Sequence, residues 1–211
     1  MTDESRAPTL DDLVANRTMS KDIAATFRAT VEGRHSFLVV AIPRFAGKTT
    51  VMRAMLGQAP KGMPVRTVED DGHDVPRLLA ASKGGYIVVP EIARMGRDGY
   101  IWGAPVRGVF EGVGDGVSLA TALHAPGMEE ALDVLTGDNG VPDKDAQKLA
   151  LVVYIRSLGR DARHPDRRVI ATVHEIESLR GGKAKANLLH RWNEQNDRFE
   201  NVSAPRRVVA G

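Results

Sequence analysis

The chain has 211 residues, of which 42% are hydrophobic and 27% charged, so one sizeable folded core is expected. Its 29 Lys and Arg against 27 Asp and Glu leave a formal charge of +2, which is too small for a polycation and argues only weakly for nucleic acid. There is no cysteine, no apolar run near the ~18 residues that span a bilayer, and no signal-peptide pattern, so disulfides and cysteine-ligated zinc are excluded and a cytoplasmic protein is expected.

The first 34 residues predict two short helices. Thr9 with Asp12 and Ser20 with Ile23 have the spacing of N-terminal caps, and apolar residues recur every four positions from Ile23 up to Gly33. We expect residues 1–34 to form a helical lead-in, residues 35–203 one domain, and residues 204–211 a tail.

From residue 36 to residue 137, expected strands alternate with expected helices. The strands are 36–42, 63–68, 86–90 and 117–123, and the helices are 49–57, 75–82 and 127–137. The apolar runs are typical of strands buried on both faces of a parallel sheet. Runs at 149–157, 167–179 and 185–192 instead indicate a closing antiparallel meander. The predicted fold class is therefore α/β, with a mostly parallel sheet, two N-terminal helices and a C-terminal antiparallel meander.

The segment AIPRFAGKTT (41–50) lies between a predicted strand and a predicted helix. Gly47, Lys48 and Thr49 match the second half of the phosphate-loop pattern G-x-x-x-x-G-K-[ST]. In such a loop the successive backbone N–H groups bind phosphate, the lysine reaches the β and γ phosphates, and the threonine hydroxyl binds Mg²⁺. An accidental GKT beside a helix is the alternative.

Ile42 stands where the first glycine of the pattern belongs. A β-branched residue resists a left-handed backbone, at a cost on the order of 1–2 kcal/mol, so we expect Ile42 to remain in the strand and Pro43 to make the turn. If Ile42 is buried there, Ile42→Gly should cost roughly 2–4 kcal/mol of stability.

Acidic residues follow two of the predicted strands. Glu69, Asp70 and Asp71 come after one strand, and Glu91 lies at the end of the next. The carboxyl ends of neighbouring parallel strands face one crevice, so one carboxylate could hold magnesium through water while another orients an attacking water. Capping of the following helices is the alternative.

Arginines gather around the hairpin expected between the first two strands of the meander. A solvated turn is favoured over a phosphate-binding patch for this group, which comprises Arg156, Arg160, Arg163, Arg167 and Arg168.

Four blocks, in this order, resemble the secretion and pilus traffic ATPases, the RecA-like motors of type II and type IV secretion and of pilus assembly. AIPRFAGKTT is similar to their Walker A loop, RTVEDD to their acidic box, YIVVPEIAR to their Walker B strand, and SLATALHAPGMEEALDVL to their histidine box. The last block is the most specific, and the resemblance covers roughly residues 8 to 202.

The resemblance implies a RecA-like P-loop NTPase core that binds ATP and Mg²⁺ and hydrolyses ATP. It implies that Glu69 is the general base, Glu91 the Walker B carboxylate, and His124 the residue that senses the γ-phosphate. The nucleotide would be held by Arg44, Phe45, Ala46, Gly47, Lys48, Thr49 and Thr50, with Thr49 also binding the metal. The implied partners are membrane-associated secretion or pilus machinery at the inner membrane, and either further copies in a ring or a full-length motor.

Three features depart from the family. Ile42 replaces the first loop glycine, Pro90 replaces the glycine before the Walker B glutamate, and only about 35 residues precede the first strand, where the motors usually carry an N-terminal domain. Two alternatives therefore stay open. One is a nucleotide-responsive, catalytically weak subunit, and the other is a nucleic-acid-handling P-loop protein, although nucleic acid is not the favoured partner.

Overall fold

The computed structural model describes residues 6–42, 45–94, 98–159, 161 and 165–209. The strands of these residues form a nine-stranded sheet in the order β2-β3-β5-β1-β6-β7-β8-β9, with β4 paired to β3. The pairings from β2 to β6 are parallel, and those from β6 to β9 are antiparallel. The predicted α/β fold class, a mostly parallel sheet with an antiparallel meander, is confirmed.

The parallel part of the sheet contains the strands expected from the apolar runs. They are β1 (Ser36–Ile42), β2 (Val65–Thr67), β3 (Gly85–Ile92) and β5 (Val117–Leu123), and a short strand that was not expected, β4 (Tyr100–Ile101), joins them. β1 lies between β5 and β6, which explains why six of its seven residues are buried.

The antiparallel part consists of β6 (Leu149–Leu158), β7 (Arg167–Arg180), β8 (Lys183–Asn193) and β9 (Arg198–Asn201). β6 pairs in parallel with β1 on one side and antiparallel with β7 on the other. The meander is therefore continuous with the parallel strands. Gly181 and Gly182, with φ of +58° and +74°, make the tight turn between β7 and β8.

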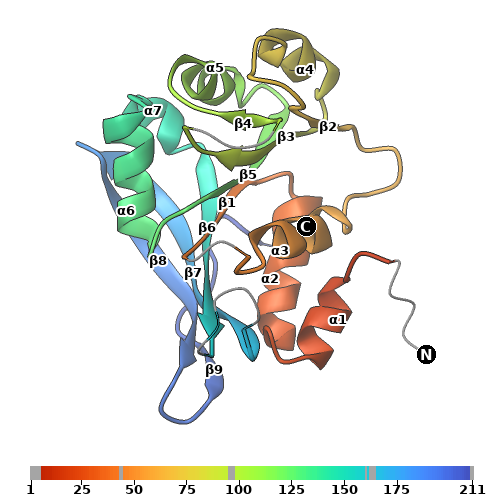
Figure 1. Cartoon of the computed structure of the whole chain (residues 1–211), viewed down its shortest axis with the longest axis vertical. Helices are drawn as coiled ribbons and strands as arrows, with labels where there is room; N and C mark the ends of the chain where they lie inside the picture. Colours follow the sequence, from red (N-terminus) through yellow and green to blue (C-terminus); the bar gives the residue numbers. More distant parts are fainter. Residues whose placement is uncertain (1–5, 43–44, 95–97, 160, 162–164, 210–211) are drawn as a thin grey trace.

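Helices cover both faces of the sheet and divide the core into two clusters (Figure 1). One face carries α1 (Leu10–Ala15), α2 (Lys21–Glu32) and α3 (Lys48–Leu56). The other carries α4 (Val75–Ala81), α5 (Ala104–Gly112), α6 (Met128–Asp133), its π-helical continuation η1 (Val134–Asp138) and α7 (Asp143–Ala146). Val39 of β1 belongs to the first cluster and its neighbour Val40 to the second, as the alternation of a strand requires.

The two lead-in helices begin where their caps predict. The Thr9 hydroxyl accepts a hydrogen bond from the Asp12 amide while the Asp12 carboxylate accepts one from the Thr9 amide, and Ser20 caps α2. Leu10 and Phe27 are fully buried against the sheet, so these helices are part of the core. No helix in the described residues is long and apolar enough to cross a membrane.

The chain leaves β1 and β5, which are neighbours, toward opposite faces. β1 is followed by α3 on one face, and β5 is followed by α6 on the other. In open α/β sheets, ligands bind at the carboxyl ends of the strands where the connections diverge in this way. The topology therefore places the candidate ligand site at the end of β1 and β5.

Candidate functional site

A pocket of about 450 Å³ opens at the carboxyl ends of β1, β3 and β5. It is lined by Phe45, Ala46, Gly47, Lys48, Thr49, Thr50, Glu91, Tyr100, His124 and Arg168. The predicted site residues are therefore brought together here, with two exceptions. Arg44 lies outside the described residues, and Glu69 does not line the pocket.

The loop that enters α3 forms one wall of this pocket. Gly47, with a φ of +96°, precedes the helix, and the first turn of α3, which is described in full, contains no acidic side chain. The amide groups of such a turn lack helical partners and attract anions. Phe45 also has a positive φ, of +68°, a backbone conformation that residues other than glycine rarely adopt.

Ile42 remains in β1, as expected, but it is not buried. Its side chain is 50% exposed because β5 ends its pairing with β1 at Val40, which leaves Ile42 paired only with Arg156 of β6. The burial on which the expected loss of roughly 2–4 kcal/mol for Ile42→Gly depends is therefore not found, and that range, which holds for buried sites, does not apply. The turn expected at Pro43 lies outside the described residues.

Three charged or titratable side chains meet at the base of the pocket. Lys48 Nζ lies 3.3 Å from Glu91 Oε1, and His124 Nε2 lies 2.9 Å from the same oxygen. Lys48 Nζ is also 3.3 Å from each ring nitrogen of His124. Lys48 and Glu91 are only 6% and 7% exposed. A buried lysine at the start of α3, a buried glutamate from β3 and a partly exposed histidine after β5 thus form one cluster.

Glu91 lies within β3, which extends to Ile92, rather than beyond its end. The pairing of β3 with β5 is irregular between Val89 and Ile92, where Pro90 stands. Proline has no amide to donate and is tolerated at such irregularities. The Oε1 atom of Glu91 is buried and, although Lys48 and His124 lie near it, no group of the described residues is aligned to donate a hydrogen bond to it.

No family model matches the chain, and no curated protein matches it. Solved structures do match. The ATPase DotB of Legionella pneumophila superposes with a TM-score of 0.58 at 13% identity, over 80% of this chain and 51% of that one. The VirB11 ATPase from the Brucella suis type IV secretion system, in complex with sulphate, gives a TM-score of 0.49 at 19% identity, over 80% of this chain and 57% of that one.

The chain shares the fold of the part of DotB that it matches. The resemblance to the secretion ATPases that the sequence predicts is confirmed at the level of the fold, a RecA-like sheet with its loop and helix in the expected place. The chain spans about half the length of the structures that it matches.

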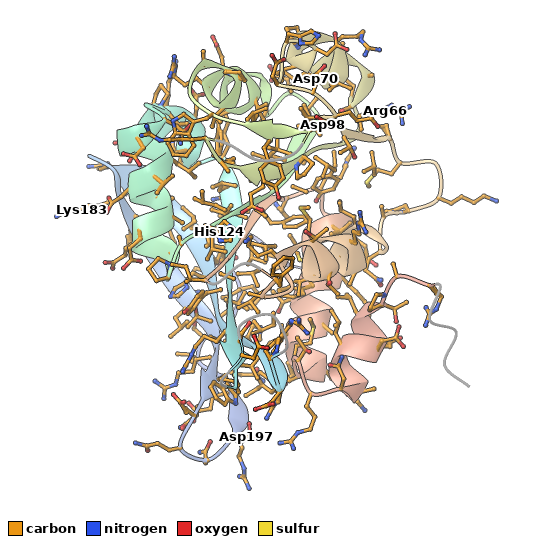
Figure 2. The ribbon with its side chains drawn as sticks, in the orientation of Figure 1. Arg66, Asp70, Asp98, His124, Lys183 and Asp197 are labelled. Atoms are coloured by element: carbon orange, nitrogen blue, oxygen red, sulfur yellow. The ribbon has the colours of Figure 1, made fainter. Side chains whose placement is uncertain are left out.

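Within this fold, the acidic segment after β2 does not line the pocket. Glu69 is exposed, and its neighbour Asp70 lies above His124, near the top of the molecule, in Figure 2. Asp70 Oδ1 accepts a hydrogen bond from the Gly72 amide, and its carbonyl accepts one from Gly99. Of the two acidic segments, only the one with Glu91 reaches the pocket, and the role of Glu69 stays a prediction.

Two residues of the pocket were not predicted. Tyr100 comes from β4, where it pairs with Glu91, and the glycine-rich sequence around it gives no periodic signal. Arg168 comes from β7, and its Nε and Nη2 atoms donate to the Phe45 carbonyl at 3.2 and 3.0 Å. The sequence favours a solvated turn for Arg168. The contact depends on β6 alone separating β1 from β7, which the sequence does not show.

A second pocket, of about 360 Å³, lies on the other side of the loop. It shares Ala46, Gly47, Thr50 and Arg168 with the first pocket. Its remaining wall is formed by Pro8, Leu13, Asn16, Thr18, Val51, Ile155, Pro165, Asp166 and Arg167. The two pockets therefore adjoin at the start of α3.

Proposed function

We propose that this chain binds ATP with Mg²⁺ and hydrolyses it, as the core of a secretion or pilus motor. The observation that carries the proposal is the cluster of Lys48, Glu91 and His124 at the end of a phosphate loop, in which Lys48 and Glu91 are buried. Lysine and glutamate are almost never this buried in proteins unless they are paired, and a pocket in which several polar groups converge is the usual place for a ligand site.

The phosphates would bind at the start of α3. Successive amides from Phe45 to Thr49 and the uncompensated helix N-terminus provide the donors, and Lys48 provides the charge for the β and γ phosphates. The presence of Ile42 in place of the first glycine of the pattern does not remove these groups, because Ile42 precedes them and lies in β1.

Magnesium fits the oxygen atoms that face the same pocket. Thr49 is exposed at the first turn of α3, and Glu91 Oε1 is buried without an aligned donor. Magnesium prefers hard oxygen ligands and keeps several of its waters, so Thr49 would bind it directly and Glu91 through water. When bound, the ion neutralises charge on the transferring phosphoryl group.

The side chains of the cluster would then position the reaction. Glu91 orients a water, and His124, which contacts both Glu91 and Lys48, couples the carboxylate to the group that holds the γ-phosphate. Glu69 is proposed as the general base by resemblance alone. For that role Glu69, which does not line the pocket in this structure, must reach into it.

The nucleotide would extend across the loop. With the phosphates in the first pocket, the ribose and base would occupy the second, because both pockets share Gly47 and Thr50. The fold likeness supports membrane-associated secretion or pilus machinery as the protein partner, with the chain in a ring or joined to a full-length motor.

Lys48→Ala tests the function. The expected result is an affinity for Mg·ATP lower by about tenfold to a hundredfold, since hydrogen bonds to charged groups contribute about 1.5–3 kcal/mol. Calorimetric titration measures it, with Lys185→Ala as the control because Lys185 is exposed and paired with Glu177. Unchanged affinity in folded Lys48→Ala would show that the GKT is accidental.

A catalytically weak, nucleotide-responsive subunit is the second candidate, and the left-handed Phe45 favours it. Glu91→Gln separates the two. For an ATPase the variant keeps Mg·ATP affinity and loses phosphate release. A wild type that binds Mg·ATP but releases phosphate no faster than Glu91→Gln is the weak subunit.

A further inference from the structure

We propose that Arg168 is a second phosphate-binding cation, contributed to the pocket by the antiparallel part of the sheet. The proposal rests on the proposed function, because it assigns a further contact to the same nucleotide. Lys48 would hold the phosphates from the start of α3, and Arg168 would hold them from β7, on the opposite side of the loop.

The position of Arg168 is set by the sheet. Ile42 of β1 is in register with Arg156 of β6, and Arg168 of β7 is in register with the next residue, Ser157. Arg168 is therefore two strands away from the point where β1 gives way to the phosphate loop. A long side chain is needed to cross β6, and Arg168 provides it, with two nitrogens on the Phe45 carbonyl.

The loop is shaped to admit this side chain. A Cβ atom on Gly47 would lie 2.9 Å from Arg168 Cδ, a distance that side-chain carbons do not adopt. Gly47 thus serves the loop by its positive φ and also by leaving space for the arginine stem. The guanidinium is held at the mouth of the pocket by packing and by a neutral carbonyl.

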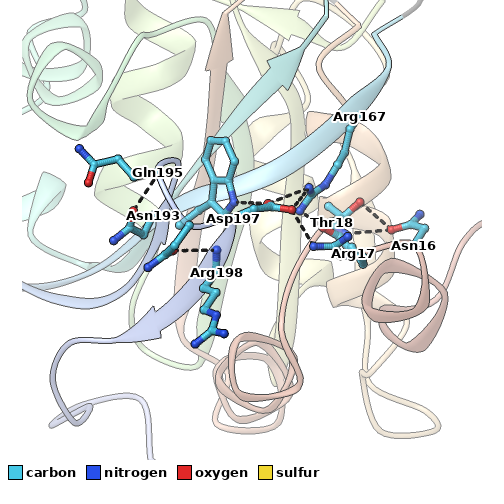
Figure 3. A network of polar contacts seen from close by, with 10 residues as sticks. Asn16, Arg17, Thr18, Arg167, Asn193, Gln195, Asp197 and Arg198 are labelled. Carbon is cyan, nitrogen blue, oxygen red and sulfur yellow. Dashed lines mark hydrogen bonds and ion pairs between the residues drawn. The ribbon is translucent and has the colours of Figure 1, made fainter.

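Neighbouring arginines of the meander are neutralised by carboxylates. Arg156 donates to Glu194 at 2.9 Å, and Arg167 donates to Asp197 at 2.8 Å, where Figure 3 shows it within a larger polar network. Within the described ranges, no carboxylate lies at ion-pairing distance from Arg168. Its charge and its remaining N–H donors are therefore available to an anion.

Both pockets include Arg168, which places it at their junction. A nucleotide that spans the two pockets must pass its phosphate chain between Arg168 and the start of α3. The second pocket also contains Asp166, which disfavours an anion there. The phosphates are therefore expected on the side of Arg168 that faces Lys48, where a guanidinium can donate two parallel hydrogen bonds to one phosphate.

Calorimetric titration of the full chain with Mg·ATP, inorganic pyrophosphate and adenosine tests this contact. Arg168→Met keeps the aliphatic stem that packs on Gly47 and removes the donors. The expected affinities for ATP and pyrophosphate fall by about tenfold or more, the range for a lost charge-assisted hydrogen bond, while adenosine binds as before. Arg156→Met is the matched control, because it removes the same charge at the same edge from a paired arginine, and it should change affinity by less than about twofold.

The outcomes separate this proposal from the function on which it rests. If the wild type binds ATP and Arg168→Met binds ATP and pyrophosphate equally well, Arg168 has no phosphate contact and the ATPase proposal stands. An equal loss for adenosine would show a merely structural role and overturn the contact. If the wild type binds neither ATP nor pyrophosphate, both proposals fail. Should Arg168→Met not fold, Arg168→Lys decides, since wild-type affinity in that variant would contradict a guanidinium-specific contact.

Discussion

Two buried glutamates, one in each part of the sheet, are held in opposite ways. Glu175 of β7 is fully buried, and its carboxylate accepts hydrogen bonds from the backbone amides of Arg206, Arg207 and Val208 at 2.7–3.0 Å. Glu91 of β3 is almost as buried, yet its Oε1 atom has no aligned donor among the described residues. Both carboxylate oxygens of Glu175 in the antiparallel part accept hydrogen bonds, whereas Oε1 of Glu91 in the parallel part accepts none from the described residues.

The difference separates structural from functional burial. Burial alone would raise the pKa of Glu175, but hydrogen bonds from the amides of Val208, Arg206 and Arg207 outweigh it and hold the pKa below its usual value. That carboxylate fastens the C-terminal segment to the sheet. Glu91 instead faces a pocket with Lys48 and His124. An incompletely satisfied carboxylate is costly, and it is retained where a ligand or a water completes it.

The largest expected effect compares the two glutamates by the same substitution. Glu175→Gln should lower the free energy of unfolding by about 3 kcal/mol, because charge-assisted hydrogen bonds contribute about 1.5–3 kcal/mol each and the new NH₂ group faces amide donors. Glu91→Gln removes the ion pair with Lys48 but should cost less, since glutamine keeps an oxygen beside Lys48 and His124 and Oε1 has no aligned hydrogen bond to lose. Urea unfolding of both variants measures the contrast. Equal losses would show that burial, and not hydrogen bonding, distinguishes the two sites.

The second expected effect is a loss of stability on acidification that arises in the antiparallel part. Burial lowers the pKa of His174 on β7 and of His190 on β8. At these two histidines the unfolded chain then binds more protons than the folded one as the pH falls below about 6.5, so their contribution to the free energy of unfolding is constant above that pH and declines below it. Glu175, whose folded pKa is lowered, adds a further loss only in stronger acid.

Unfolding titrations between about pH 7.5 and 5 measure this decline, around the ordinary histidine pKa. His174→Gln should make it shallower, because glutamine does not titrate. If His174→Gln keeps the wild-type slope, the decline comes from other groups, such as His35, whose pKa is also lowered by burial.

The sequence predicts those features of both regions that depend on neighbouring residues. The apolar runs locate β1 and β5 with their exact bounds, the Thr9 and Asp12 pattern locates the start of α1, and GKT locates the start of α3. The features that the sequence does not predict depend on the order of the strands in the sheet. Whether Glu69 or Glu91 reaches the pocket is decided by the position of β2 at the edge of the sheet, and Arg168 meets Phe45 across 123 positions of the chain.

The third expected effect concerns Ile42, at the end of β1. Because its side chain is half exposed, Ile42→Gly should lower the free energy of unfolding by only about 1 kcal/mol, the cost of a glycine in a strand. Affinity for Mg·ATP per folded molecule should be equal or higher, since the loop gains freedom. Thermal unfolding and calorimetric titration on one preparation measure both. A loss of several kcal/mol would show that Ile42 packs against more than β6.

The smallest expected effect is local relief of strain in the phosphate loop. Phe45 has a φ of +68° and is 63% exposed, so its ring contributes little packing while its backbone is held in a left-handed conformation. Such a conformation costs about 1–2 kcal/mol for a non-glycine residue, and glycine relieves this cost. Glycine also gives the unfolded chain more conformational freedom, which lowers the free energy of unfolding by about 0.4–1 kcal/mol. Phe45→Gly should therefore raise the free energy of unfolding by about 0.5 kcal/mol.

Asp115→Gly is the matched control for this variant. Asp115 is also left-handed, with a φ of +48°, but it lies in the turn before β5, away from the pocket lining. Both variants should gain stability by similar amounts, and only Phe45→Gly should alter Mg·ATP affinity, because the Phe45 carbonyl is the group that Arg168 holds. If Phe45→Gly loses stability instead, the exposed ring is packed in solution. If both variants change Mg·ATP affinity by the same factor, the left-handed backbone of Phe45 has no specific effect on the pocket. It is then an ordinary feature of a turn, as at Asp115.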